Sequence, residues 1–178
     1  VFSSGGSYLG LSVKTDARGE AEFRLPAASY RFRADLQGSQ FWASAGVVAD
    51  TVNYVDLHTG GGEFHLSVDT GSGPLVGVKV YVFSAGGSYL GISGTTSSAG
   101  EISFALSQGS YNFRVDYLGY QFWSSVETVP TNLSDVLAIP HQNVTITVNE
   151  VYGSQVTPLA GVPAYLFTDS GSYLGGSM

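Results

Sequence analysis

The side chains that could carry catalysis or bind a metal ion are few and scattered. The 178-residue chain has no cysteine and three histidines, His58, His65 and His141. No two of the histidines have the spacing of a zinc-ligand pair. No nucleophile-elbow motif surrounds any serine. We therefore expect no catalytic residue, no cofactor and no metal site, and we expect that the protein is not an enzyme.

Two charged pairs recur at the same spacing. Arg33 precedes Asp35 by two residues, as Arg114 precedes Asp116. Residues two apart on a strand share one face, so each arginine can pair with its own aspartate. An exposed ion pair, worth at most about 1 kcal/mol, is the simpler interpretation. A contact with a neighbouring domain is the alternative.

Aromatic side chains form the third group, and they bear most directly on function. Neighbours on a strand point to opposite faces, so Phe41-Trp42 and Phe122-Trp123 cannot each place both rings in one core. Three interpretations stay open. Loops of the same domain cover the outer rings, or the rings form a self-association face, or they stack on sugars. The candidate face comprises Tyr81, Phe83, Trp42, Trp123, Tyr165 and Phe167.

These groups recur because the chain is a tandem repeat. Val82–Ser125 matches Val1–Ser44 at an offset of 81 positions, with GSYLG and QFW motifs in common. A third start follows 84 positions later, where Pro158–Val162 matches Pro74–Val78. The period predicts a partial repeat at 1–58, a complete repeat at 63–140 and the start of a third at 143–178. We expect the sequence to be a window on a longer array.

Within each repeat, apolar and polar residues alternate with period two. Val78, Val80 and Val82 share one face of a predicted strand, and Tyr81 and Phe83 lie on the other. This alternation is typical of half-buried strands, and Gly/Ser clusters separate the runs at the spacing of a sandwich. We expect an all-β chain of tandem Ig-like antiparallel sandwiches. The predicted core of the complete repeat is Val78, Val80, Val82, Phe104, Leu106, Tyr111, Phe113 and Val115.

The same patterns place strands in the flanking repeats. We expect 64–69 to open the complete repeat and 52–57 to close the first. In the third repeat we expect an opening strand at 143–150, a long turn at 152–157 and a second strand at 162–167.

The complete repeat resembles a known family. The motifs that carry the resemblance are Gly73-Pro74-Leu75-x-Gly77-Val78-x-Val80, Thr95-Thr96-x-x-x-Gly100, Gly109-x-Tyr111-x-Phe113 and Gly119-Tyr120. They are similar to the carboxypeptidase regulatory-like domain, which groups with transthyretin-like and collagen-adhesin B-type domains of prealbumin-like fold. Because these are turn and core positions, the resemblance implies the fold rather than an activity.

Collagen-adhesin B-type domains often hold an internal Lys–Asn or Lys–Asp isopeptide bond promoted by a buried acid. The chain has only Lys14 and Lys79, and neither lies in the opening strand. Val115 and Ala34 occupy the core-facing position where the resemblance implies an acid. We expect no isopeptide bond.

Composition excludes several partners. The formal net charge is −7 with only seven Lys and Arg residues, which argues against nucleic-acid binding. No apolar run is long enough to span a bilayer, so we expect no membrane insertion. Charged residues make up 12% of the chain, and Ser, Thr, Gly, Asn and Tyr must cover the outside, as in many secreted and cell-surface β proteins. Asn132 and Asn143 open glycosylation sequons, which matter only where the source has that pathway.

The leading hypothesis is a structural repeat of a large secreted or cell-surface protein that self-associates into a stalk, sheath or filament. Its partners are then other copies of itself, head to tail and laterally. The alternative is a repeat adhesin or carbohydrate-binding accessory module, with polysaccharide as the partner.

Overall fold

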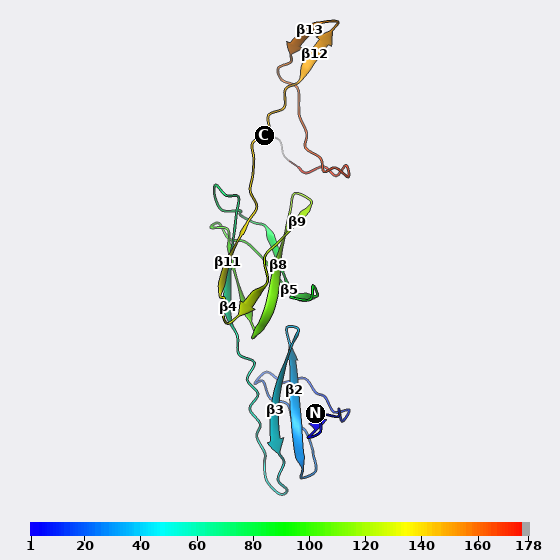
Figure 1. The fold of residues 1–178 in the computed structure, drawn as a ribbon, viewed down its shortest axis with the longest axis vertical. Helices are drawn as coiled ribbons and strands as arrows, with labels where there is room; N and C mark the ends of the chain where they lie inside the picture. Colours follow the sequence, from blue (N-terminus) through cyan, green and yellow to red (C-terminus); the bar gives the residue numbers. More distant parts are fainter. Residues whose placement is uncertain (176–178) are drawn as a thin grey trace. The chain divides into compact units, whose positions relative to one another are not determined.

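The computed structural model describes residues 1–175 and is built from strands and loops (Figure 1). No helix occurs in the described residues, so none of them forms a helix able to cross a membrane. The all-β, sandwich-type fold expected from the alternation is confirmed.

The complete repeat contains two sheets. One has the order β10-β8-β5-β6, with β9 also paired to β8, and the other has the order β11-β4-β7. The strands of the first sheet are β5 (Lys79–Ser84), β6 (Tyr89–Thr95), β8 (Gly109–Tyr117), β9 (Tyr120–Trp123) and β10 (Glu127–Val129). Those of the second are β4 (Gly62–Asp69), β7 (Glu101–Leu106) and β11 (Ser134–Ala138).

The inner faces of these sheets form the core. Phe104 of β7 and Phe113 of β8 stack across the layers with ring centroids 5.9 Å apart. All eight predicted core residues are buried, and Val80, Val82, Phe113 and Val115 are inaccessible to solvent. The core prediction is therefore confirmed. It succeeds because each strand keeps strict period two, which fixes the face of every side chain once one is placed.

One pairing differs from the expected antiparallel sheets. β11 runs parallel to β4, with Ser134 opposite His65 and Ala138 opposite Asp69. The chain reaches β11 from β10 in the other sheet, so it crosses between layers and enters in the direction of β4. A hairpin would have required antiparallel pairing, but a crossover does not.

The first repeat forms one sheet, in the order β1-β2-β3. Its strands are β1 (Phe2–Ser3), β2 (Ser29–Leu36) and β3 (Ser39–Gly46). The expected closing strand at 52–57 is wrong, because those residues form no ladder. Its counterpart β11 pairs with β4, and residues 1–58 include no segment that matches β4.

The absence of a β4 counterpart explains why residues 20–25, which match β7, form no strand. Residues 8–14 match β6, whose partner is β5, and residues 1–58 contain no match for Lys79–Tyr81 of β5. A strand needs a hydrogen-bonded neighbour. The turn between them nevertheless keeps its form. The Asp16 N–H donates to Glu20 O at 2.9 Å, as the Ser97 N–H donates to Glu101 O at 2.9 Å.

Asp16 also caps this turn with its side chain. Its Oδ1 accepts the N–H groups of Glu20, at 3.0 Å, and Arg18, at 2.8 Å. These donors, Glu20 first, hold the pKa of Asp16 below its usual value. Local sequence therefore specifies the turn, and tertiary pairing specifies the strands.

The third repeat departs from expectation in two places. Residues 143–148 form no strand, and 149–152 instead begin a hairpin of β12 (Asn149–Tyr152) and β13 (Gln155–Pro158). The segment expected as a long turn is thus the interior of that hairpin, because β12 finds its nearest pairing partner within its own repeat. The expected strand at 162–167 is also wrong, and only a single bridge joins Phe167 to Tyr173. Its counterpart β5 lies between β6 and β8, and the described part of the third repeat supplies neither.

By compactness, the chain divides into two units. One contains Val1–Phe64, Ala105–Ser110 and Thr128–Leu133, and the other contains His65–Phe104, Tyr111–Glu127 and the chain from Ser134 onward. These limits fall inside β4, β7, β8 and β10, so they do not follow the repeats. The repeat boundaries 1–58, 63–140 and 143–178 stay a prediction.

Candidate functional site

The outer face of the larger sheet carries a cluster of rings, named here the outer cluster: Tyr81, Phe83, Tyr89, Arg114 and Trp123. Pairing of β5 with β8, and of β8 with β9, brings these side chains together. The Phe83 and Trp123 ring centroids lie 4.8 Å apart, and Phe83 and Tyr89 lie 5.4 Å apart. Val80, Val82 and Val115 face inward from the same strands. The predicted placement of Tyr81 and Phe83 opposite the valine stripe is confirmed.

Arg114 joins the rings of the outer cluster. Its guanidinium lies 4.8 Å from the centroid of Tyr81, 5.1 Å from Phe83 and 5.7 Å from Trp123. Asp116 holds the guanidinium from one side, with Nε to Oδ1 at 2.8 Å and Nη2 to Oδ2 at 3.1 Å. This fork fixes the plane of the guanidinium, so that its flat face can rest on the rings.

The first repeat builds the same arrangement. Arg33 forms a fork with Asp35, with Nε to Oδ1 at 2.8 Å and Nη2 to Oδ2 at 2.8 Å. Its guanidinium lies 5.2 Å from the Phe2 ring and 5.7 Å from Trp42. Phe2 and Trp42 match Phe83 and Trp123 at the offset of 81, and their centroids lie 4.9 Å apart. The outer cluster is thus a property of the repeat.

The third repeat begins the same arrangement. Phe167 and Tyr173 lie 5.4 Å apart, and Tyr165 and Tyr173 lie 6.1 Å apart. Tyr165 and Phe167 match Tyr81 and Phe83 at the offset of 84.

The two ion pairs are less exposed than the sequence suggested. Each arginine pairs with its own aspartate on the same strand, as the simpler interpretation expected. The Arg114 side chain is only 20% exposed because the rings cover it, whereas that of Arg33 is 31% exposed.

The structure brings the predicted face together within each repeat but does not expose it evenly. Phe83 is 8% exposed, covered by Trp123, Tyr89 and Arg114 of its own repeat. For Phe83, the interpretation that the domain covers its own outer rings therefore applies. Trp123 and Trp42 keep 44% and 40% of their surface exposed, and Tyr165 and Phe167 keep 63% and 53%. These four are the exposed members of the predicted face, and Tyr81 is half-buried.

Sequence reasoning missed the tyrosine of the GSYLG motif as a member of the face. Tyr8, Tyr89 and Tyr173 each pack on the phenylalanine six residues before them. The signal was present, because this motif is common to all three repeats.

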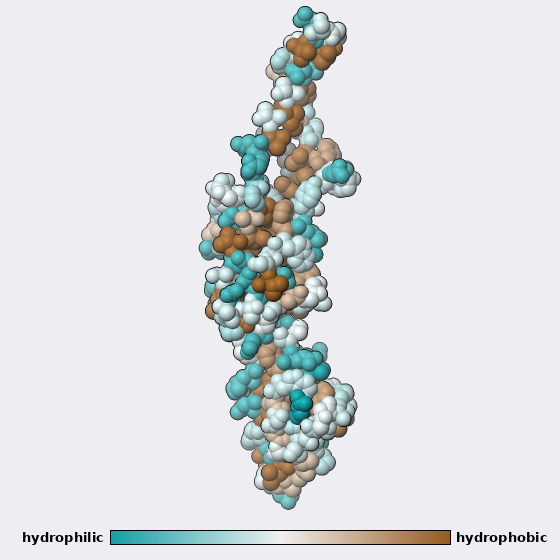
Figure 2. Space-filling model, viewed as in Figure 1, coloured by the Kyte–Doolittle hydropathy of each residue, from teal (hydrophilic) through white to brown (hydrophobic). Residues whose placement is uncertain are grey.

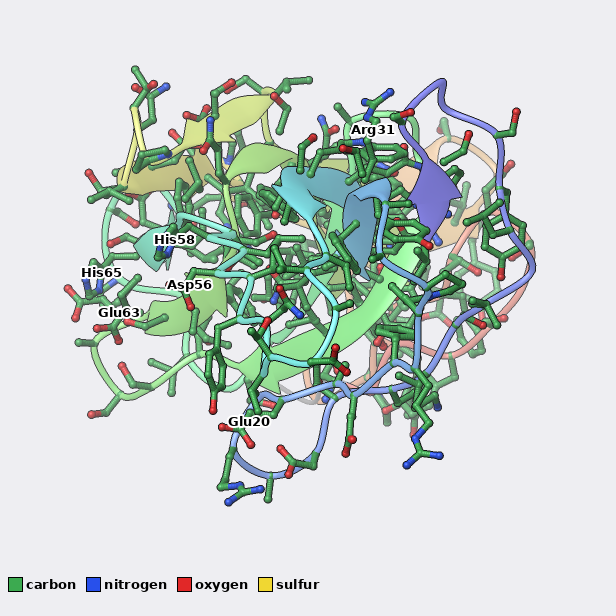
Figure 3. All side chains as sticks on the ribbon, turned by 90° about the horizontal axis from the view of Figure 1, so that it is seen from below. Glu20, Arg31, Asp56, His58, Glu63 and His65 are labelled. Atoms are coloured by element: carbon green, nitrogen blue, oxygen red, sulfur yellow. The ribbon has the colours of Figure 1, made fainter. Side chains whose placement is uncertain are left out.

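The histidines and acids of the described residues do not gather into a metal centre. His65 Nδ1 hydrogen-bonds Ser103 Oγ at 2.8 Å, and His141 contacts Ile139 O and Tyr117 Oη. Figure 3 labels Asp56, His58, Glu63 and His65 among the side chains of the chain. Across residues 1–175, no group of three or more His, Asp or Glu side chains is placed to hold an ion.

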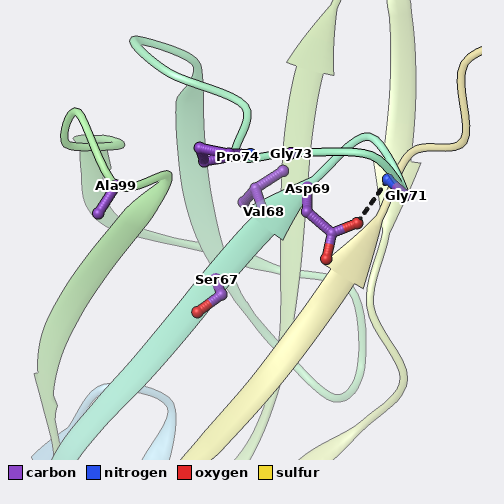
Figure 4. Close-up of a pocket in the computed structure, with 7 residues that line it drawn as sticks. All are labelled: Ser67, Val68, Asp69, Gly71, Gly73, Pro74 and Ala99. Atoms are coloured by element: carbon purple, nitrogen blue, oxygen red, sulfur yellow. Dashed lines mark hydrogen bonds between the residues drawn. The ribbon is translucent and has the colours of Figure 1, made fainter.

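A shallow groove of about 480 Å³ lies at the end of β4 (Figure 4). Its one ionisable side chain is Asp69, whose Oδ1 accepts the Gly71 N–H at 2.8 Å. With a single carboxylate already engaged in a turn, the groove offers no acid–base pair. The remaining lining residues are Ser67, Val68, Gly73, Pro74 and Ala99.

The chain matches no model of a known protein family and no curated protein. Among solved structures, it is similar to the Bacillus anthracis TIE protein, with 16% sequence identity and a TM-score of 0.38. The alignment covers 70% of this chain and 27% of that protein.

Arg114→Lys should lower the free energy of unfolding by about 1–2 kcal/mol, because lysine cannot make the fork to Asp116 or replace the contacts of a planar guanidinium with three rings. Urea unfolding followed by Trp fluorescence measures the change, since Trp123 lies in the outer cluster. Arg24→Lys, at an exposed position, is the control and should leave stability unchanged. Equal midpoints for the two variants would contradict a stabilising role for the stacked arginine.

Proposed function

We propose that the chain is a structural repeat of a secreted or cell-surface protein whose copies associate into a stalk, sheath or filament. The proposal concerns the kind of partner, which is another copy of the repeat, and it requires no catalytic centre.

One observation carries the proposal: side chains at matching repeat positions are buried in the complete repeat and exposed in the third. Val144-x-Ile146 aligns with Phe64-x-Leu66 at an offset of 80, because the four extra residues of the third repeat lie after this segment, in its longer first turn. Phe64 and Leu66 are both 0% exposed, whereas Val144 and Ile146 are 75% and 65% exposed. Figure 2 shows apolar residues at the surface along the part of the chain that carries β12 and β13.

The energetic consequence is large. Burying one Val, Ile or Phe side chain contributes about 1.5–3 kcal/mol. Extended segments with free N–H and C=O groups also recruit strands from a partner. Because the repeats share their sequence pattern, another copy carries strands of matching shape for residues 143–167. Association of copies therefore satisfies both the apolar faces and the backbone groups.

The test replaces exposed apolar side chains with charge. Ile146→Asp combined with Phe167→Asp should reduce the sedimentation-velocity mass of the 178-residue chain toward that of a single chain. Val76→Asp is the matched control, because Val76 is 54% exposed but lies in a loop of the complete repeat. If the double variant assembles as the unchanged chain does, the third-repeat strands do not mediate association and the proposal is wrong.

A second candidate is a carbohydrate-binding accessory module or adhesin. The observation that favours it is the exposure of Trp42 and Trp123, at 40% and 44%, each beside a guanidinium. Exposed Trp rings with adjacent hydrogen-bonding groups suit stacking on sugars. Trp123→Ala should then abolish binding in a polysaccharide pull-down, whereas a self-associating repeat should retain no polysaccharide with or without the substitution.

A further inference from the structure

The sheet of the first repeat ends at β3, a long strand that contains no charged residue. β3 reads SQFWASAG, and it pairs with β2 over its whole length, from Ser29 opposite Gly46 to Leu36 opposite Ser39. The pairing contains no bulge, and β3 forms the end of the β1-β2-β3 sheet. Its second row of backbone groups therefore faces away from β2.

Proteins usually blunt such edges with charge, proline, bulges or short length. The other strands at sheet ends in residues 1–175 carry at least one of these devices. β6 pairs with β5 through a bulge at Val82/Phe83, β7 opens with Glu101, and β11 contains Asp135. β1 has two residues, and β10 has three and is followed by Pro130. In the hairpin at 149–158, β12 carries Glu150 and β13 ends on Pro158.

The complete repeat shows how its matching edge is interrupted. β9, the counterpart of β3, stops at Trp123 after four residues. The Ser124 N–H still donates to Phe113 O at 2.9 Å, but the Phe113 N–H donates to the Ser124 side-chain Oγ at 2.9 Å instead of to a backbone carbonyl. Residues 124–126 then form no strand, and the next strand opens on the buried Glu127. Gly46 stands at the position matching Glu127, so the first repeat lacks both the break and the acid.

We infer that β3 is a self-pairing edge, at which a second copy of the chain adds its own β3 in antiparallel orientation. This inference deepens the proposed function by naming the surface used for lateral association. A strand paired antiparallel with itself forms an isologous, two-fold contact, in which the same residues serve both copies. No side chain of β3 carries a charge that would repel its equivalent across the axis.

Geometry also restricts the register. The outer side chains Gln40, Trp42 and Ser44 are exposed, and Phe41, Ala43 and Ala45 on the inner face are half-buried. The two copies keep their outer faces on the same side of the joined sheet only when the two-fold axis passes through a residue, which then lies opposite its equivalent in the other copy. A slip of one residue would place outer side chains opposite inner ones. The axis therefore passes at Trp42 or Ala43, because these two positions leave the largest number of β3 residues paired.

The chain contains no cysteine, so single cysteines report this register directly. We would introduce one cysteine at a time at positions 40 to 45 and measure disulfide-linked dimer under mild oxidation. One maximum at 42 or 43 is expected. Two positions from the axis, equivalent residues lie about 13 Å apart along the strand, beyond the roughly 7 Å Cα span of a disulfide. A flat profile would overturn the inference.

A second variant keeps the test independent of the cysteines. Gln40→Lys with Ser44→Lys should weaken dimerisation by about tenfold or more, because the lysines of one copy would face those of the other across the β3–β3 contact. Ser98→Lys with Ser72→Lys adds the same charge in exposed turns of the complete repeat and should leave dimerisation unchanged. Equal dimerisation of both double variants would also overturn the inference.

These results separate the inference from the proposed function. If the chain assembles while the cysteine profile is flat and the lysines have no effect, β3 is not the contact and the structural role stands. If Ile146→Asp with Phe167→Asp leaves assembly unchanged while the cysteine maximum is present, β3 pairs as inferred and the association through third-repeat strands fails.

Discussion

Val115→Glu should destabilise the complete repeat by about 4 kcal/mol at neutral pH, enough to unfold a marginally stable domain. Val115 is 0% exposed and lies opposite Val80 in β5 and Phe122 in β9. A carboxylate there finds no cation, so burial favours the neutral acid and raises its folded-state pKa above the unfolded value of about 4.3. Chemical unfolding measured as a function of pH tests this result.

The direction of the pH dependence follows from that shift. A carboxyl whose folded-state pKa is raised is least unfavourable below the unfolded pKa, and stability is lost as pH rises toward the folded pKa. The deficit of Val115→Glu relative to the unchanged chain should therefore shrink from pH 8 to pH 4. Ala34→Glu is the matched control, because Ala34 holds the same repeat position but is half-buried. A comparable loss in both variants would show that the two repeats bury this position equally.

Gly100→Ala should lower the free energy of unfolding by about 3 kcal/mol, whereas Gly19→Ala, at the matching repeat position, should lower it by about 1 kcal/mol. Both glycines have positive φ, +74° and +77°, in the same turn, so alanine is strained at each. At Gly100, a Cβ would also lie 2.7 Å from Val68 O and 2.8 Å from Pro74 Cβ. At Gly19, nothing lies within 4 Å of the added carbon.

The steric part of this difference, about 1–3 kcal/mol, comes from packing the turn against β4. Thermal or urea unfolding of the two variants measures it. Comparing Gly100→Ala with Gly19→Ala separates the cost of tertiary packing from that of backbone strain, since the turn itself is the same in both repeats. Equal losses would mean that the turn at Gly19 is packed as tightly as the turn at Gly100.

The sequence predicts the core well because burial follows period two. Tyr111, Phe113 and Val115 alternate with Asn112 and Arg114, and all three are buried as expected. The sequence predicts less well which matching segments become strands. Residues 8–25 carry almost the same pattern as β6 and β7, yet they form no sheet strand because no neighbour supplies hydrogen bonds.

Two further misses have local causes. The hairpin of β12 and β13 turns at Gly153-Ser154, a two-residue connection of the type that joins hairpin strands, so its signal was present in the sequence. The stacking of Arg114 on three rings was not predictable from spacing alone. It depends on the registers of β5 with β8 and of β8 with β9, which bring Tyr81, Phe83 and Trp123 around one guanidinium.

Electron microscopy of the purified 178-residue chain, imaged as its concentration is raised, tests the structural role most directly. A self-associating repeat predicts ordered filaments or sheets whose amount grows with concentration, together with a solution mass well above 18.7 kDa. Fields without assemblies at every concentration, with a constant solution mass of 18.7 kDa, would contradict the proposed structural role.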